Sequence, residues 1–234
     1  MMRPPWLGTH QLSEDIPLID ARLDGMLGSF ALDTGNGGTT VIQQIWADGN
    51  GLAESFRQGL ESVSYGAGGI SHAWTRRANT LEIAGTTLER PITRLATDKA
   101  GAFSRTEAGN IGTEVLAHFT LTFDYARQRI CFEPKPGFVP RPYDHSGLRA
   151  QKMPSGVFNV ALVIEGSPAA QAGIAAGDDI TEVDGQPAAQ LSGNDLSHRL
   201  RQSPGTRVSV AWHHKDDRRH AEHRSTLILR ELLP

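Results

Sequence analysis

The residue with the most favourable setting for chemistry is Asp33. It lies in the stretch GSFALDTGNGG, directly after a run of apolar residues and directly before Thr34 and Gly35. A preceding apolar strand, a tight turn and nearby backbone N–H groups can hold a carboxylate in place and change its affinity for protons. Aspartate is also common in ordinary turns, where its side chain only caps the backbone. The tripeptide alone leaves both interpretations open, a reactive carboxylate and a turn former.

Segments of β-strand length surround this carboxylate. Short apolar or alternating runs recur up to residue 134, which is the pattern of buried and half-buried strands. The runs are IPLIDARL (16–23), GSFALDTG (28–35), TTVIQQIW (39–46), NTLEIAGTTLE (79–89), ITRLA (92–96) and FTLTFDYARQRICFEP (119–134). They predict a mostly β domain with one or two short helices.

Composition and charge narrow the classes of partner. The chain has 234 residues, a formal net charge of −3, 25 glycines and 13 prolines. That charge provides no field that would collect nucleic acid or an anionic membrane, and no run approaches the roughly 20 apolar residues of a membrane span. The single cysteine, Cys131, excludes an internal disulfide and a cysteine-rich zinc site. We expect no cofactor, no metal, no nucleic acid partner and no membrane insertion.

A compositional break divides the chain. Residues 133–147, EPKPGFVPRPYDHSG, contain four prolines and two glycines without apolar periodicity, which is typical of a linker. We therefore expect one domain at residues 1–133, a linker at 134–147 and a second domain at 148–234. Beyond the linker, the patterns follow the order strand, short helix, strand, helix and hairpin, which predicts a small α+β module.

Three ordered motifs in the first domain resemble the retropepsin-like aspartic proteases. They are IPLIDARLDGMLGSFALDTGNGGTTVI (16–42), the glycine-rich VSYGAGGISHAW (63–74) and NIGTEVLAHFTLTFDYARQRICFEP (110–134). The resemblance implies an acid protease β-barrel domain in which Asp33 is catalytic. It further implies that Thr34, Gly35, Ile111 and Gly112 support the active site. The flap over the substrate would contain Tyr65, Gly66, Gly68 and Gly69. Asn36 departs from the family, which more often has Ser, Thr or Ala there.

The aspartic mechanism needs two carboxylates that share one proton, because two like charges a few ångströms apart cannot both ionise. This chain has one Asp-Thr-Gly. A second aspartate would come from a homodimer mate or from an upstream repeat. LDTGNGG, YGAGG and DKAGAFSRTEAGNIG resemble the second of two repeats in bacterial predicted aspartyl proteases with a carboxyl-terminal PDZ domain. That resemblance implies a periplasmic or cell-envelope location, although MMRPPWLGTH lacks the apolar core of a signal peptide.

The second domain resembles the PDZ domains attached to bacterial proteases, on the stretch VIEGSPAAQAGIAAGDDITEVDGQP (163–187). PDZ domains bind an extended peptide as an added strand between a sheet edge and a helix. The resemblance places a terminal carboxylate at the loop Ser155, Gly156 and Val157 and the receiving strand at Phe158 to Val160. Leu196 and Leu200, four residues apart, would line the helix side of the groove or belong to the core of the domain.

These observations predict an aspartic-type endopeptidase with a PDZ domain that recognises protein or peptide substrates. The alternative is a non-catalytic peptide-binding or scaffold protein, in which the protease fold is degenerate or supplies half of an active site. The cleft walls that would set substrate sequence depend on tertiary structure.

Overall fold

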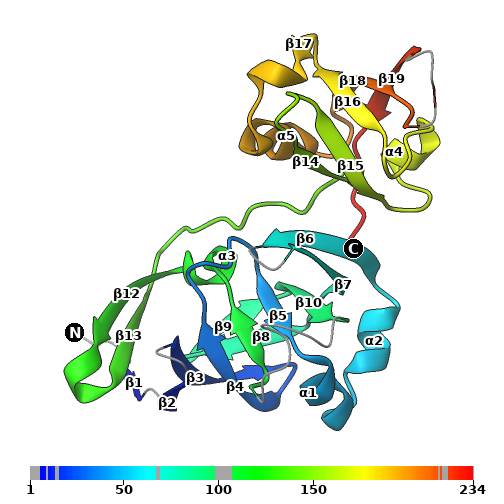
Figure 1. Ribbon diagram of the computed structural model, residues 1–234. Coiled ribbons are helices and arrows are strands. Elements are labelled where there is room, and N and C mark those ends of the chain that lie inside the picture. Colours follow the sequence, from blue (N-terminus) through cyan, green and yellow to red (C-terminus); the bar gives the residue numbers. More distant parts are fainter. Residues whose placement is uncertain are drawn as a thin grey trace. The chain divides into compact units, whose positions relative to one another are not determined.

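The computed structural model is mostly β, as the sequence predicts, and forms two compact units, Met1–Pro140 and Arg141–Pro234 (Figure 1). The residues that it describes are 6–8, 10–13, 16–66, 69–97, 107–215, 217 and 221–233. The unit boundary lies inside the segment expected to be a linker. Residues 143–146 are buried in the second unit, so only the first half of that segment has the exposure of a linker.

The first unit contains a ten-stranded sheet among the described residues. Its strands follow the order β6-β7-β10-β5-β11-β4-β3-β8-β9, with β2 paired to β3. Their bounds are β2 His10–Ser13, β3 Ile16–Leu23, β4 Met26–Leu32, β5 Thr40–Ile42, β6 Leu60–Gly66, β7 Gly69–Arg77, β8 Thr80–Ile83, β9 Thr86–Glu89, β10 Ile92–Ala96 and β11 Gly109–Ile111.

A smaller sheet and short helices complete this unit. The sheet has the order β1-β13-β12, formed by Trp6–Gly8, Arg129–Pro134 and Phe119–Asp124. The helices are α1 Gln44–Gly49, α2 Ala53–Arg57, α3 Thr113–Leu116 and the 3₁₀ turn η2 Tyr125–Arg127. No helix of the described residues is long and apolar enough to cross a membrane.

Strand alternation explains how the first unit forms its core. In β3, Ile19, Ala21 and Leu23 are buried while Asp20 and Arg22 are exposed, which is the two-residue period of a strand with one face inward. The buried side chains pack into one cluster with Phe30, Phe56 and Phe132 among others. The strands and helices of the first unit therefore share one apolar core.

Strand β11 positions the Asp33 turn, which is the segment 33–39 between β4 and β5. Strand β11 pairs parallel with β4, so that Ile111 lies opposite Leu32, and antiparallel with β5, so that Asn110 lies opposite Val41. Strands β4 and β5 are the two strands that the Asp33 turn connects. Strand β11, almost eighty residues further along the chain, therefore lies between β4 and β5. It is bonded to the turn, because the carbonyl of Ile111 accepts from the amide of Asp33.

The second unit has a six-stranded sheet in its described residues, with the order β14-β15-β16-β18-β19 and β17 paired to β16. The strands are β14 Leu148–Lys152, β15 Phe158–Val163, β16 Asp179–Val183, β17 Gln186–Pro187, β18 Arg207–His213 and β19 Glu222–Ile228. The helices are α4 Pro168–Gln171, η3 Ala188–Gln190 and α5 Gly193–Leu200. A separate apolar cluster that includes Phe158, Ile180 and Trp212 forms its core.

Candidate active site and peptide-binding edge

The carboxylate of Asp33 is held by the backbone of its own turn. Its Oδ1 accepts hydrogen bonds from the amides of Gly35 and Asn36, each at 3.0 Å. The Asp33 amide donates to the carbonyl of Ile111 at 3.1 Å, which ties the turn to β11. Within the described residues both side-chain hydrogen bonds end on Oδ1, so Oδ2 is the oxygen left for water, substrate or a second carboxylate. These hydrogen bonds fix the position of the carboxylate.

The side chain and the carbonyl of Asn36 join the Asp33 turn to β11 and to the start of α3. Its Nδ2 donates to the carbonyl of Thr39 at 3.0 Å and to Oδ1 of Asn110 at 2.9 Å, and its Oδ1 accepts from the amide of Gly38 at 2.8 Å. Its carbonyl accepts from the amide of Thr113 at 2.9 Å. In sequence, Asn36 is a departure from the family that the first domain resembles. The feature of the sequence that could have indicated this structural role is the residue type, because an asparagine side chain can donate and accept hydrogen bonds at the same time.

Ile111 and Gly112 lie directly against this turn. Ile111 is fully buried, and a β-carbon at Gly112 would lie 2.3 Å from the carbonyl oxygen of Gly38 and 2.6 Å from Nδ2 of Asn36. Real β-carbons do not approach other atoms so closely, so only glycine fits at residue 112. Thr34 and Gly35, in contrast, are exposed, and Asp33 is half-buried.

The expected flap corresponds to the hairpin of β6 and β7. Tyr65 is opposite Ile70 and Gly66 is opposite Gly69 in its register. Hydroxyl pairs join the two strands, with Ser64 and Ser71 at 2.8 Å. Gly68 and the side chain of Tyr65 lie outside the described residues. Gly69 has a φ of +100°, which suits glycine at the start of β7.

The structure places the expected carboxylate loop of the second unit in a tight hairpin. Ser155, Gly156 and Val157 belong to the hairpin that joins β14 to β15. The amide of Gly156 donates to the carbonyl of Met153 at 3.0 Å, and the carbonyl of Val157 accepts from the amide of Met153 at 2.9 Å. These groups are bonded within the turn, because a hairpin this short closes on its own backbone.

The expected receiving strand lies in the interior of the sheet. Phe158 pairs with Lys152 of β14 on one side and with Ile180 of β16 on the other, and both Phe158 and Val160 are buried in the core. A strand with neighbours on both sides cannot accept a third one at the same residues. Leu196 and Leu200 are buried in the same core, which is the alternative that the sequence leaves open.

Strand β14 is the edge of the sheet nearest to α5. It is the first strand in the sheet order of the described residues and has a partner on one side, β15. Helix α5 packs against it (Figure 1), and the amide of His145, just before β14, donates to the carbonyl of Leu200 at 2.9 Å. The element that can accept an added strand beside a helix is therefore β14, one strand earlier than the sequence predicts.

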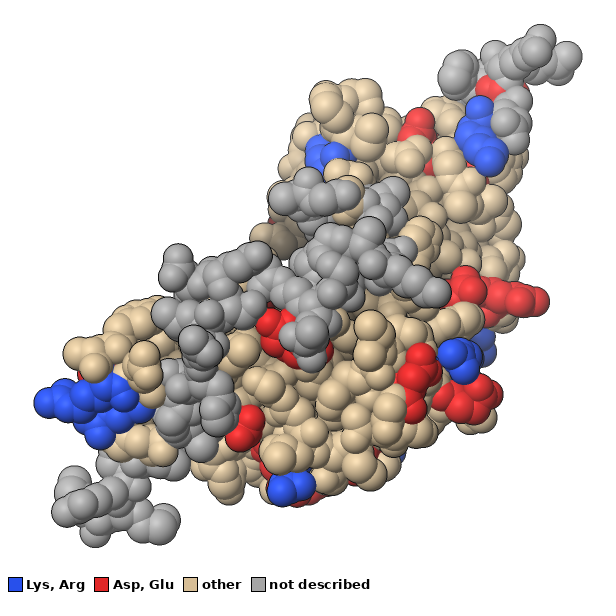
Figure 2. Space-filling view, turned by 60° about the horizontal axis from the view of Figure 1, so that its bottom comes forward, with Lys and Arg blue, Asp and Glu red and all other residues tan. Residues whose placement is uncertain are grey.

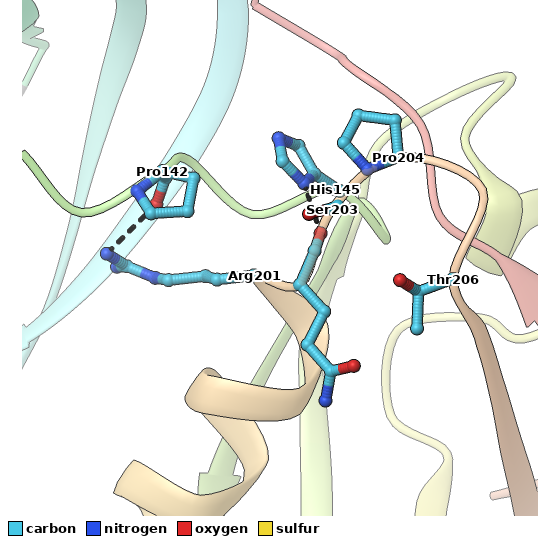
Figure 3. A pocket seen from close by; sticks show the side chains of 7 residues that line it. Pro142, His145, Arg201, Ser203, Pro204 and Thr206 are labelled. Carbon is cyan, nitrogen blue, oxygen red and sulfur yellow. Dashed lines mark hydrogen bonds between the residues drawn. The ribbon is translucent and has the colours of Figure 1, made fainter.

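A pocket of about 390 Å³ lies where α5 ends (Figure 3). It is lined by Pro142, His145, Arg201, Gln202, Ser203, Pro204 and Thr206. Arg201 donates to the carbonyl of Pro142 at 3.4 Å, and Nδ1 of His145 lies 2.7 Å from the carbonyl oxygen of Gln202. The sequence gives no sign of this pocket, because the composition around residues 142 and 145 indicates a linker.

Charge does not single out a further site on the visible face. Figure 2 shows acidic and basic side chains in small separate groups on a surface that is mostly uncharged. Among the described residues, no three histidine, cysteine, aspartate or glutamate side chains gather as a metal site would require.

Two comparisons found proteins with similar parts. The family model of the PDZ domain matches residues 160–212. A solved structure described as a retropepsin-like aspartic protease from Rickettsia conorii has 14% sequence identity and a TM-score of 0.42, over 54% of this chain and 87% of that chain. No curated protein matches the sequence. The PDZ match confirms the prediction of a PDZ domain in the second unit, and the first unit is mostly β, as the sequence predicts.

Proposed function

We propose that this chain is an aspartic-type endopeptidase in which Asp33 supplies one of two catalytic carboxylates. The observation that carries the proposal is the fixed Asp33 turn, with Oδ1 bonded to two amides and β11 beneath it. In the proposed reaction an ionised carboxylate takes a proton from water as its oxygen attacks the peptide carbonyl carbon. The partner carboxylic acid donates its proton to the carbonyl oxygen, which gives a tetrahedral gem-diol. As the C–N bond breaks, the first carboxyl gives the proton that it took from water to the leaving nitrogen, and the partner carboxylate takes back a hydroxyl proton as the new carboxylic acid forms.

The second aspartate comes from another Asp-Thr-Gly turn, in a homodimer mate or in an upstream repeat. Thr34 and Gly35 are exposed beside Asp33, as residues that meet a second turn must be. Thr34 would then hydrogen-bond across the twofold axis, and Gly35 would let the two backbones approach. Tyr65, Gly66, Gly68 and Gly69 would form the flap over the substrate.

In the same proposal the second unit binds an extended protein segment as an added strand on β14, beside α5. The position of β14 at the sheet edge and the PDZ family match support this part. Binding of protein segments by this unit would bring substrates to the paired carboxylates.

The test begins with the mass of the chain in solution across a dilution series, measured by light scattering. A dimer that cleaves unfolded casein, and loses at least about a hundredfold in rate in Asp33→Asn, would support the proposal. The matched control is Asp48→Asn, an exposed aspartate on α1, which should cleave at the rate of the unchanged protein. Cleavage that persists in Asp33→Asn would exclude the aspartic mechanism, and a monomer would exclude the homodimer.

A second candidate is a peptide-binding protein without hydrolysis. Asn36 favours this non-hydrolytic candidate, because the proteases that the first domain resembles more often have Ser, Thr or Ala at that position. Peptide binding without turnover, at every pH tested and for the dimer as well as the monomer, would select this candidate.

A further inference from the structure

We propose that the β14 edge takes internal segments of proteins and not free carboxyl termini, because Asp144 already fills the backbone amides that would hold a terminal carboxylate. The inference rests on the proposed peptide binding of the second unit. It names the class of segment that this unit selects and the residue that sets the selection.

The amides in question lie in the loop that leads into β14. The amides of Ser146 and Gly147 both donate to Oδ1 of Asp144, at 3.0 and 2.7 Å, and Gly147 has a left-handed φ of +75°. Successive amides that converge on one point, with a left-handed residue among them, form a site for an anion. Such a site in front of a receiving strand is the backbone feature that captures a peptide carboxylate.

The remaining amides of this loop also have partners inside the unit. The amide of Leu148 donates to Oγ of Ser146 at 3.0 Å, and that hydroxyl donates to Oδ1 of Asp144 at 2.8 Å. The amide of His145 donates to the carbonyl of Leu200. Four consecutive amides, from residue 145 to residue 148, are therefore satisfied without a ligand.

Asp144 is held firmly in this position. The residue is 2% exposed, and Nη1 of Arg149 lies 3.4 Å from its Oδ2. A second carboxylate would have to displace this buried, paired group or lie beside a like charge, and either route is unfavourable. Removal of water from two like charges adds to the penalty.

The edge of β14 beyond this loop remains usable by a different kind of ligand. In an antiparallel sheet alternate N–H and C=O groups of an edge strand point away from its neighbour. An internal extended segment needs only these groups and space beside α5, and it brings no terminal charge. The filled anion site therefore selects for internal segments.

The test uses the full chain and two displayed libraries of random decapeptides. One library ends in a free carboxylate, and the other continues into a constant glycine-serine tail. A decapeptide with a free terminus can still bind through its internal residues, so both libraries should be enriched to a similar extent. Selected peptides synthesised as free acids and as terminal amides should bind with dissociation constants within about threefold of each other, because the terminal carboxylate gains no contact. Enrichment of the free-terminus library alone, or about tenfold tighter binding of the acids, would overturn the inference. Enrichment of neither would refute the proposed peptide binding itself.

The Asp144→Ala variant tests the named residue. Loss of its carboxylate frees the amides of Ser146 and Gly147, so free acids should gain about tenfold over their amides, as charge-assisted hydrogen bonds form. Asp144→Asn retains an acceptor for the amides and guards against loss of the fold. Asp178→Ala is the matched control, because Asp178 is 1% exposed and also accepts from two amides, of Ala175 and Lys215. An equal gain in Asp178→Ala, or no gain in folded Asp144→Ala, would contradict the assignment to Asp144.

Discussion

The side-chain amide of Asn36 donates to Oδ1 of Asn110 over 2.9 Å, across 74 positions of sequence. Asn36 lies in the turn that presents Asp33, and Asn110 lies in β11, the strand inserted between β4 and β5. The bond joins the turn to the strand that separates its two flanking strands. Rigid presentation of the Asp33 carboxylate therefore depends on a residue outside the Asp-Thr-Gly motif.

Replacement of Asn36 by alanine should loosen this turn. The variant loses the hydrogen bonds to Thr39, Asn110 and Gly38, each worth about 0.5–1.5 kcal/mol net. We expect faster amide hydrogen exchange in residues 33–38, measured by mass spectrometry, while the second unit exchanges as before. Unchanged exchange in that segment would show that the backbone alone holds the turn.

Replacement of Gly112 by alanine should disturb the same turn by overpacking. The new β-carbon would meet the carbonyl of Gly38 at 2.3 Å, and such clashes typically cost about 1–3 kcal/mol. The expected result is a lower urea midpoint for the first unit, followed by tryptophan fluorescence. The matched control is Gly37→Ala, because a β-carbon there would meet nothing within 4 Å. Equal midpoints for the two variants would contradict the packing argument.

Cys131 should be unreactive in the folded protein. It is 2% exposed in β13, and burial, aided by the charge of Glu133, raises the pKa of its thiol. Because the thiolate is the reactive form, we expect negligible labelling by iodoacetamide in buffer and complete labelling in denaturant. Rapid stoichiometric labelling of the native chain would mean that β13 opens readily.

The first unit should lose stability in mild acid through His118. Burial lowers the pKa of this imidazole below its ordinary value of 6.5, and the ring lies 4.3 Å from that of Phe138. The folded state then binds the proton less well than the unfolded state, so the contribution is present above the unfolded pKa and is lost as pH falls through the folded pKa. Urea midpoints between about pH 7.5 and about pH 5.5 should fall less in His118→Gln. Equal falls in both proteins would exclude His118 as the cause.

The capping box of α5 offers a test in the second unit. Ser192 Oγ accepts from the amide of Asp195 at 3.2 Å and donates to its carboxylate at 2.7 Å. The Ser192 side-chain hydrogen bond is the main reason that the pKa of Asp195 is lowered from 3.8. In Ser192→Ala we expect that pKa to rise, by NMR titration, and the unfolding temperature to fall by about 4 °C. The folded pKa lies below the unfolded one, so this stabilisation is lost as pH falls through the folded value. Ser203→Ala, an exposed serine beyond the helix, should leave both quantities unchanged.

Local sequence patterns predict much of the secondary structure, because strand formation depends on neighbouring residues. In β3, apolar and polar residues alternate in the sequence, and buried and exposed positions alternate in the same way in the structure. The strands at Asp33 and at Phe158 are also where the sequence predicts strands. Whether a strand is an edge or has two partners is not local, which is why the sequence places an open edge at Phe158 while the sheet order places it at β14.

The segment before β14 shows the same limit in a different way. Its prolines, glycines and polar residues indicate a linker when residues are counted one by one. The hydroxyl of Ser146 donates to the carboxylate of Asp144, and both side chains accept hydrogen bonds from loop amides. Because their polar atoms have partners, the two residues can be buried, with exposed fractions of 2% and 0%. Composition records which groups are polar but not whether those groups have partners.

The sequence by itself therefore determines the mostly β class, the two-part order and the carboxylate best placed for chemistry, because strand periodicity and turn motifs depend on neighbouring residues. Tertiary structure alone decides that Asn36 and β11 hold the Asp33 turn, that β14 is the sheet edge beside α5, and that Asp144 accepts from the amides of Ser146 and Gly147 in front of it. Each of these depends on hydrogen bonds or strand pairing that the fold brings together, and such contacts leave no periodic signal in the chain.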